Sequence, residues 1–215
     1  ASYNGTYANV TTKALRTNGF AMAGSATAKV VSGTTAVTIT VKRVVAKVEV
    51  QCTMTDAFRT KYGKGCVQVN KITLSKGAEK SYLIDQTTSK YATVSSTFTS
   101  AQDSYCDKTG ASATNQYKYN NLFYINEKAS AAAGSRVKLV IEAIYDADGN
   151  IATTADQMPI SYETELTGTT GNKIVRNGSY KINAKLDGLT GQDVTLAVTV
   201  ANWEALATQD VNLGE

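Results

Sequence analysis

An alternation of apolar and polar residues with a period of two is the feature that most constrains the fold of this chain. It is clearest in Ser179–Asp187, where lysine and asparagine residues separate the apolar ones. Because successive side chains of a β-strand point to opposite faces, this pattern predicts a strand with one buried face. The residues predicted to be buried there are Tyr180, Ile182, Ala184 and Leu186. The same alternation in Arg136–Tyr145, Pro159–Leu166 and Val194–Val200 predicts an all-β protein.

The alternation changes phase in one early segment. Odd positions are apolar in Val37–Val41, whereas even positions are apolar in Val44–Val50. A regular strand cannot change phase, because its side-chain period is two. We therefore expect a β-bulge or a crossing to a second sheet near Lys42–Arg43.

Turn and helix signals complete the predicted architecture. Asp148-Gly149 separates two alternating segments and predicts a hairpin, while only Thr55–Tyr62 and Ala129–Ala133 have brief helical character. Many short strands in 215 residues fit one large β-sandwich or two small ones. A long polar connection begins near Gln86, so we place a boundary there and expect two β-sandwich domains, residues 1–88 and 89–215.

The composition argues against several classes of function. The chain has no histidine, which removes the commonest general base and the usual zinc ligand, and no nucleophile–base pair is evident. Its formal net charge is only +4 and its basic residues are scattered, so nucleic acid is not an expected partner. No apolar run is long enough to cross a bilayer. We expect neither enzymatic activity, nor a cofactor, nor a metal site.

Two acidic patterns were weighed as candidate sites. Asp146-Ala-Asp-Gly-Asn150 resembles the start of a calcium loop, but Ile151 and Gln157 stand where an EF-hand loop needs glycine and glutamate. We therefore interpret the segment as a hairpin turn. Glu163 and Glu165 share a strand face, and nothing in the sequence distinguishes them from a solvated strand edge.

The three cysteines cannot all pair with one another. Cys52 and Cys66 flank one loop, so a disulfide between them is one interpretation, with Cys106 as a spare thiol.

The segment after Trp203 can form one more strand at the end of this chain. Ala205, Ala207, Val211 and Leu213 share one face of it, and no later strand is present to pair with it. An unpaired strand edge is a template for pairing with another chain. The alternatives are an ordinary edge strand and a frayed terminus. For the preceding strand we expect Trp203 to pack on its own domain and Val194, Leu196, Val198 and Val200 to be buried.

Six segments in the same order resemble the fimbrillin family of the Bacteroidales, whose members build type V pili. These segments are Gly19–Gly24, Val37–Val50, Val69–Leu83, Leu122–Glu127, Val175–Ile182 and Val198–Trp203. The resemblance implies two tandem transthyretin-like β-sandwich domains. It also implies export as a lipidated precursor and cleavage after an arginine, with Ala1 as the first residue after the cut and loss of an N-terminal strand.

The resemblance further implies a pilin that polymerises by donor-strand exchange. The tail, about residues 204–215, would be the donor, with Ala205, Ala207, Val211 and Leu213 filling the groove of the next subunit. The implied partners are other copies of the chain, accessory fimbrial subunits and host surface receptors, and the implied location is a fimbrium at the outer membrane. The alternative is a fimbrial tip or accessory adhesin, or a surface glycan-binding module.

Overall fold

The structure, a computed structural model, describes twelve segments of the chain: residues 2–3, 20–29, 31–33, 35–78, 81–84, 95–101, 121–128, 132–150, 152–167, 169–191, 193–202 and 207–213. The strands are β1 (Ser2–Tyr3), β2 (Met22–Ala23), β3 (Thr35–Arg43), β4 (Val45–Met54), β5 (Cys66–Ala78), β6 (Ser81–Tyr82), β7 (Ser95–Ala101), β8 (Asn121–Asn126), β9 (Lys138–Asp146), β10 (Gln157–Glu165), β11 (Gly178–Leu186), β12 (Val194–Asn202) and β13 (Ala207–Leu213). The helices are α2 (Asp56–Tyr62) and the 3-10 turn η2 (Thr170–Asn172). No helix among the described residues is long and apolar enough to span a membrane.

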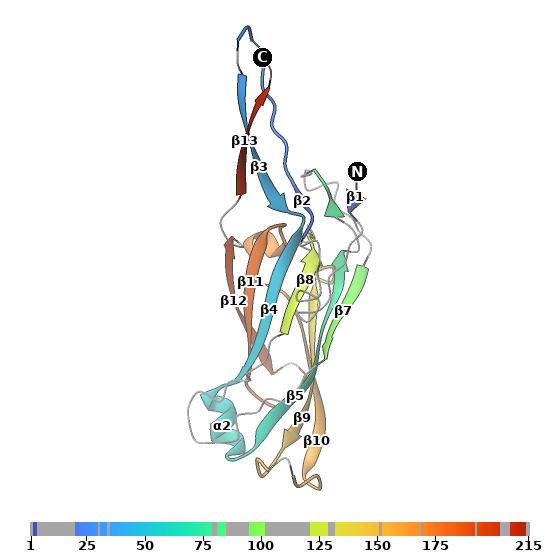
Figure 1. Ribbon diagram of the computed structural model, residues 1–215. Coiled ribbons are helices and arrows are strands. Elements are labelled where there is room, and N and C mark those ends of the chain that lie inside the picture. The colour runs from blue at the N-terminus through green and yellow to red at the C-terminus, as the bar shows by residue number, and fades with distance from the viewer. Residues whose placement is uncertain are drawn as a thin grey trace.

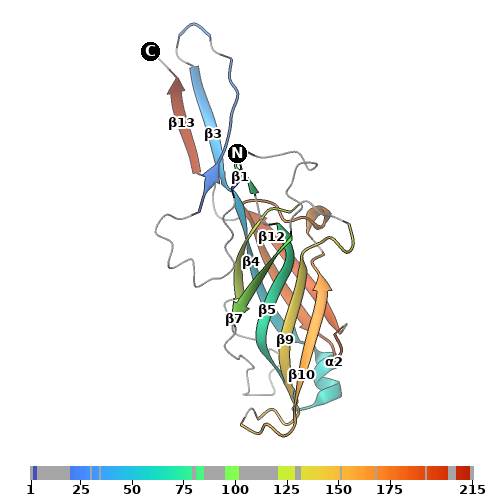
Figure 2. The same cartoon turned by 90° about the vertical axis from the view of Figure 1, so that its right-hand side faces the viewer.

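Eight of the strands form a β-sandwich. One layer has the order β7-β5-β9-β10 and the other β8-β4-β11-β12, and the backbone pair Ala78–Asn126 connects them (Figure 2). Neighbouring strands are antiparallel except β4 and β11, which are parallel. The open sides approach each other at β10, where the Tyr162 hydroxyl donates a hydrogen bond of 2.8 Å to the Gly188 carbonyl. The predicted all-β class is confirmed.

The core between the layers is where the alternation predicted it. Tyr180, Ile182, Ala184 and Leu186 of β11 are at most 2% exposed. Of the inward residues predicted around β9 and β10, Tyr145 is half-buried and the others are buried. They line one apolar cluster together with residues of β4 and β5. Burial of these side chains from water is the main term that stabilises such a sandwich.

The predicted division at residues 88 and 89 does not separate two cores in the described part of the chain. β4 and β5 lie before this division, whereas β9, β10, β11 and β12 follow it, yet all six strands belong to the same sandwich. Their buried side chains form one cluster. The tandem arrangement is therefore not seen among the described residues, because strands distant in sequence pair across the expected boundary.

The predicted phase change marks the point where one long strand leaves the sandwich. Val44 separates β3 from β4, and β3 belongs to a different sheet, with β2 and β13 as neighbours. Val44 itself is fully buried, and its backbone N–H donates a hydrogen bond of 3.0 Å to the Ala21 carbonyl. The chain crosses here from one sheet to another, which is one of the two outcomes that the alternation allowed.

The short helix is also confirmed. Thr55 is the N-cap of α2, where its hydroxyl oxygen accepts a hydrogen bond from the Phe58 N–H, and Gly63 ends the helix with a φ of 59°. A positive φ is costly for residues with a Cβ, so glycine suits this position. Phe58 of α2 is fully buried and belongs to the core cluster.

The prediction for β12 was only partly right. Val194 is buried, Leu196 and Val198 are half-buried, and Val200 is 44% exposed. The alternation is present, but β12 is the last strand of its layer, so the core covers it less and less toward its end. Trp203 lies outside the described residues.

The disulfide considered between Cys52 and Cys66 is not formed. Both residues carry thiols that are not bridged to each other, and they are 0% and 4% exposed respectively. They lie on β4 and β5, which belong to opposite layers, so each thiol fills core space as a small apolar group. Cys106 lies outside the described residues.

Two buried tyrosines make stability dependent on alkaline pH. Burial raises the pKa of both Tyr162 and Tyr180 above the ordinary value of 10.0. Above about pH 10 the unfolded tyrosines lose their protons while the folded ones keep them. Unfolding free energy should therefore fall by about 1.4 kcal/mol per pH unit for each tyrosine until the folded pKa is passed.

Urea unfolding at a series of pH values between about 9 and 12 tests this prediction. In the Tyr162→Phe variant, the fall of the unfolding free energy with pH should be shallower by about 1.4 kcal/mol per pH unit, because phenylalanine has no ionisable hydroxyl. An identical slope in the two proteins would contradict the prediction.

Candidate assembly ribbon

A narrow ribbon of strands extends beyond one end of the sandwich. β3 and β13 form it, and it lies at the end opposite α2 and the β9–β10 hairpin (Figure 1). The two strands are antiparallel, in a register that runs from Ala207 opposite Val41 to Leu213 opposite Thr35. β2 pairs with β3 at the base of the ribbon. The sheet order is β13-β3-β2.

β3 has one covered and one open face. Val37 is 9% exposed, and the odd positions after it are half-buried. The even positions are exposed, and they are Ala36, Thr38, Thr40 and Lys42. The register pairs the odd positions of β13 with the odd positions of β3, so that Val211 is opposite Val37. β3 therefore has the half-buried pattern of a sheet strand although it lies outside the sandwich.

The base of the ribbon is tightly built. A Cβ at Gly24 would lie 2.1 Å from the Thr40 carbonyl oxygen, so a larger residue cannot be accommodated there without a shift of the backbone. The Asn177 side-chain oxygen accepts hydrogen bonds of 3.4 and 3.3 Å from the backbone and side chain of Arg43. The Asn177 N–H in turn donates to the Val45 carbonyl at 2.9 Å. These contacts join the point where β3 departs to the start of β11.

A buried ion pair supports the same point from below. Glu127 and Arg176 are 1% and 4% exposed, and the Arg176 Nε donates to a Glu127 carboxylate oxygen at 2.9 Å. Arg176 also donates to the Leu83 carbonyl at 2.9 Å. The Ser81 hydroxyl lies 3.1 Å from Glu127 Oε1 and 2.9 Å from the Val44 carbonyl. The pair thus ties the short β6 segment to the residue at which β3 leaves the sandwich.

The structure pairs the C-terminal tail with a strand of its own chain. No strand follows the tail in the sequence, and its partner is β3, which lies early in the sequence. Ala207, Val211 and Leu213 lie on β13, while Ala205 and Ala1 lie outside the described residues. Their roles in assembly and maturation stay predictions. The phase change at Val44 was the sequence signal that β3 needs a partner outside the sandwich.

β13 forms a ladder with β3 in the described part of the chain. Among the described residues it pairs with no strand of the sandwich, and it is an outer strand of its sheet. The described core cluster likewise consists of residues from the sandwich, the loops that connect its strands and α2. Release of β13 therefore breaks one ladder and leaves the described core unchanged.

The comparisons with known proteins gave structural matches only. No protein-family model and no curated protein matches the sequence. Solved structures similar to this chain include a putative cell adhesion protein of Bacteroides eggerthii (16% identity, TM-score 0.45), a fimbrilin of Porphyromonas gingivalis (18%, 0.44) and a fimbrial protein of Bacteroides vulgatus (11%, 0.47).

These matches cover 76–77% of this chain and 56–59% of the solved chains, so the chain spans less than two thirds of their length. Their descriptions name fimbrial and cell adhesion proteins of Bacteroides and Porphyromonas species.

Proposed function

We propose that this chain is a structural subunit of a bacterial surface fimbria and that copies of it polymerise head-to-tail by donation of β13. The observation that carries the proposal is the pairing of β13 with β3, on a ribbon outside the sandwich, with no sandwich strand as a further partner in the described part of the chain. The six sequence segments that resemble fimbrillins support it independently.

The ribbon has few contacts that stabilise it. A two-stranded ribbon is only marginally stable in water by itself, because it buries little apolar surface. Its backbone hydrogen bonds can be made equally well with an equivalent strand of another copy. Exchange of β13 between copies therefore costs few backbone hydrogen bonds and adds contacts between subunits. It is also heterologous, so it propagates as an open filament.

The proposal includes the partners and the location that such a filament implies. The first partner is another copy of the chain, followed by accessory fimbrial subunits, with host surface receptors at the exposed end. The location is the cell surface.

A disulfide lock between β13 and β3 tests the proposal. Thr38 and Asp210 are directly opposite in the register, so cysteines at both positions can bridge the two strands. If β13 must leave its own β3, the oxidised Thr38→Cys/Asp210→Cys protein should stay monomeric. Reduction should restore assembly to the level of the wild-type chain. Electron microscopy and sedimentation measure both states.

The two single-cysteine variants and the oxidised wild-type chain are the controls, because the chain has three native cysteines. All three should assemble normally. Filaments of normal length from the oxidised double variant would mean that β13 stays on its own β3, and strand donation by this tail would be wrong.

A further inference from the structure

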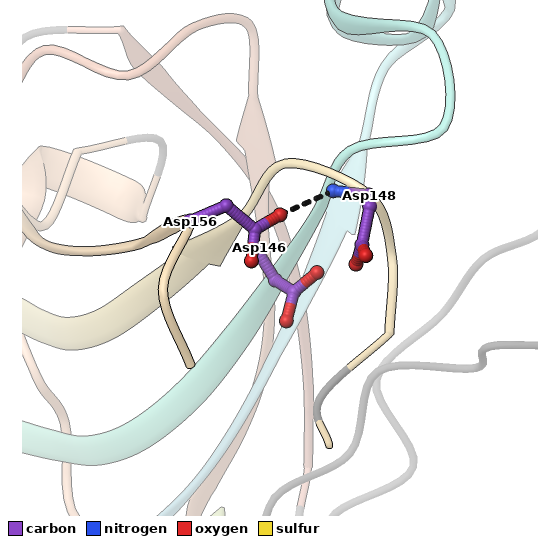
Figure 3. A group of neighbouring side chains, drawn as sticks. All are labelled: Asp146, Asp148 and Asp156. Atoms are coloured by element: carbon purple, nitrogen blue, oxygen red, sulfur yellow. Dashed lines mark hydrogen bonds between the residues drawn. The ribbon is translucent and has the colours of Figure 1, made fainter. Parts of the chain in front are cut away.

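Three carboxylates meet at the end of the sandwich opposite the ribbon. Asp146 ends β9, Asp148 lies in the hairpin loop, and Asp156 immediately precedes β10. Each offers an oxygen atom, and these oxygens all lie within 4.8 Å of one another (Figure 3). The calcium-loop pattern in the sequence includes Asp146 and Asp148 but not Asp156. The hairpin brings Asp156, which is ten residues after Asp146, back to these two carboxylates.

The buried member of this group has an oxygen that no protein group satisfies. Asp146 is 0% exposed, and its Oδ1 has no hydrogen-bond partner among the described residues. Its Oδ2 accepts a hydrogen bond of 3.0 Å from the Gln157 side-chain amide. The Asp156 Oδ1 is likewise buried without a partner. In Figure 3 the Asp146 carboxylate points into the space between the other two. Buried carboxylate oxygens without a donor are costly, so this arrangement calls for a positive group.

The loop holds the other carboxylates in place. The Asp148 N–H donates to Asp156 Oδ2 at 2.9 Å, while the Asp148 carboxylate accepts from the Asn150 N–H at 2.6 Å and from the Thr153 hydroxyl at 3.0 Å. Among the described residues, no lysine or arginine forms an ion pair with any of the three.

We propose that Asp146, Asp148 and Asp156 form a binding site for a divalent cation, and that this cation is calcium. The ligand atoms are all oxygens, which hard cations prefer, and the group contains no histidine or thiol. Calcium accepts six to eight oxygens in an irregular arrangement, whereas magnesium needs a nearly ideal octahedron, so an irregular hairpin loop suits calcium better. The sequence of this loop differs from an EF-hand loop, because Ile151 and Gln157 stand at the glycine and glutamate positions. The structure replaces the missing ligand with Asp156, which that pattern does not include.

Calcium would clamp the two ends of the hairpin. Asp146 is opposite Gln157 in the β9–β10 pair next to the loop, and Asp156 directly precedes Gln157. One ion would therefore bridge the end of β9 and the residue just before β10. A ligand that binds only the folded state stabilises it according to its concentration over Kd. At calcium concentrations about a hundredfold above Kd, the melting temperature should rise by about 5–10 °C.

Calorimetric titration of the full chain, stripped with a chelator, tests the site with calcium chloride and separately with magnesium chloride. One calcium ion should bind per chain, at least about tenfold more tightly than magnesium, and a thermal scan should show the expected rise. Asp148→Asn is the main variant, because Asp148 is exposed and its replacement should not unfold the protein. It should weaken calcium binding by about tenfold or more.

Glu142→Gln is the matched control, because it removes one negative charge from β9, the strand that Asp146 ends, but outside the group of three carboxylates. It should bind calcium as the wild type does. The proposal is overturned if about 10 mM calcium neither binds nor raises the melting temperature, since extracellular calcium modules bind at about 0.1–1 mM. It is also overturned if Asp148→Asn binds calcium as tightly as Glu142→Gln.

Discussion

Removal of residues 205–215 should leave a folded monomer that no longer forms filaments. The sandwich should keep its described core, because in the described part of the chain β13 pairs with β3 and the core cluster lies among the sandwich strands, their connecting loops and α2. The truncated chain should therefore unfold cooperatively, within a few degrees of the full chain. Analytical ultracentrifugation and electron microscopy should show monomers where the full chain shows polymers.

Two point variants test which face of β13 matters. Val211 is opposite Val37, which is 9% exposed, whereas Thr208 is opposite Thr40, which is exposed. Val211→Asp should reduce assembly by at least about tenfold, because it places a charge on the covered side of the ladder, where desolvation is costly. Thr208→Asp adds the same charge on the open side and should assemble like the wild type.

The outcomes separate two explanations. Equal loss of assembly in both variants would show that charge on the tail, and not its face, controls polymerisation. Normal filaments from the truncated chain would show that another part of the protein is the donor, and the proposed assembly would be wrong.

Removal of the buried arginine should cause the largest loss of stability expected from one substitution. Arg176→Ala leaves the Glu127 carboxylate buried without its main partner and removes the donor to the Leu83 carbonyl. Breaking one side of a buried ion pair costs about 3–5 kcal/mol. Urea unfolding should show this loss as a lower midpoint with an unchanged slope.

An exposed ion pair provides the control. Lys71 and Glu142 are 2.7 Å apart with side chains 42% and 48% exposed, so Lys71→Ala should cost less than about 1 kcal/mol. The double variant Arg176→Met/Glu127→Leu should be more stable than Arg176→Ala, because it buries no unpaired charge. A cost below about 1 kcal/mol for Arg176→Ala would contradict the ion pair's role in holding β6 and Val44 together.

Much of the sandwich was predictable because strand alternation is a local property. The inward residues of β9, β10 and β11 and the phase change before Val44 were read from neighbouring positions, and the structure confirms them. Thr55 and Gly63 similarly bound α2 through local capping. In each case the chain's own backbone period or cap chemistry decides the outcome.

The predictions that failed concerned the neighbours of a strand. Val200 alternates correctly, yet it is 44% exposed because β12 is an outer strand, and alternation does not reveal sheet order. Cys52 and Cys66 are near in sequence, but strand pairing places them on opposite layers. Pairing between distant strands also bears on the boundary expected at residue 88, since β4 pairs with β11 across it.

The candidate sites divide along the same line. The residue pattern was enough to predict an all-β chain, a β-bulge or a crossing between sheets near Lys42–Arg43, and a strand in the tail. The choice of a crossing at Val44, the pairing of the tail with β3 and the approach of Asp156 to Asp146 and Asp148 were found in the three-dimensional structure. Periodicity is set by bonded neighbours and is visible in any short window. Contacts between distant segments depend on which ladders and layers together bury the most apolar surface, and no short window contains that information.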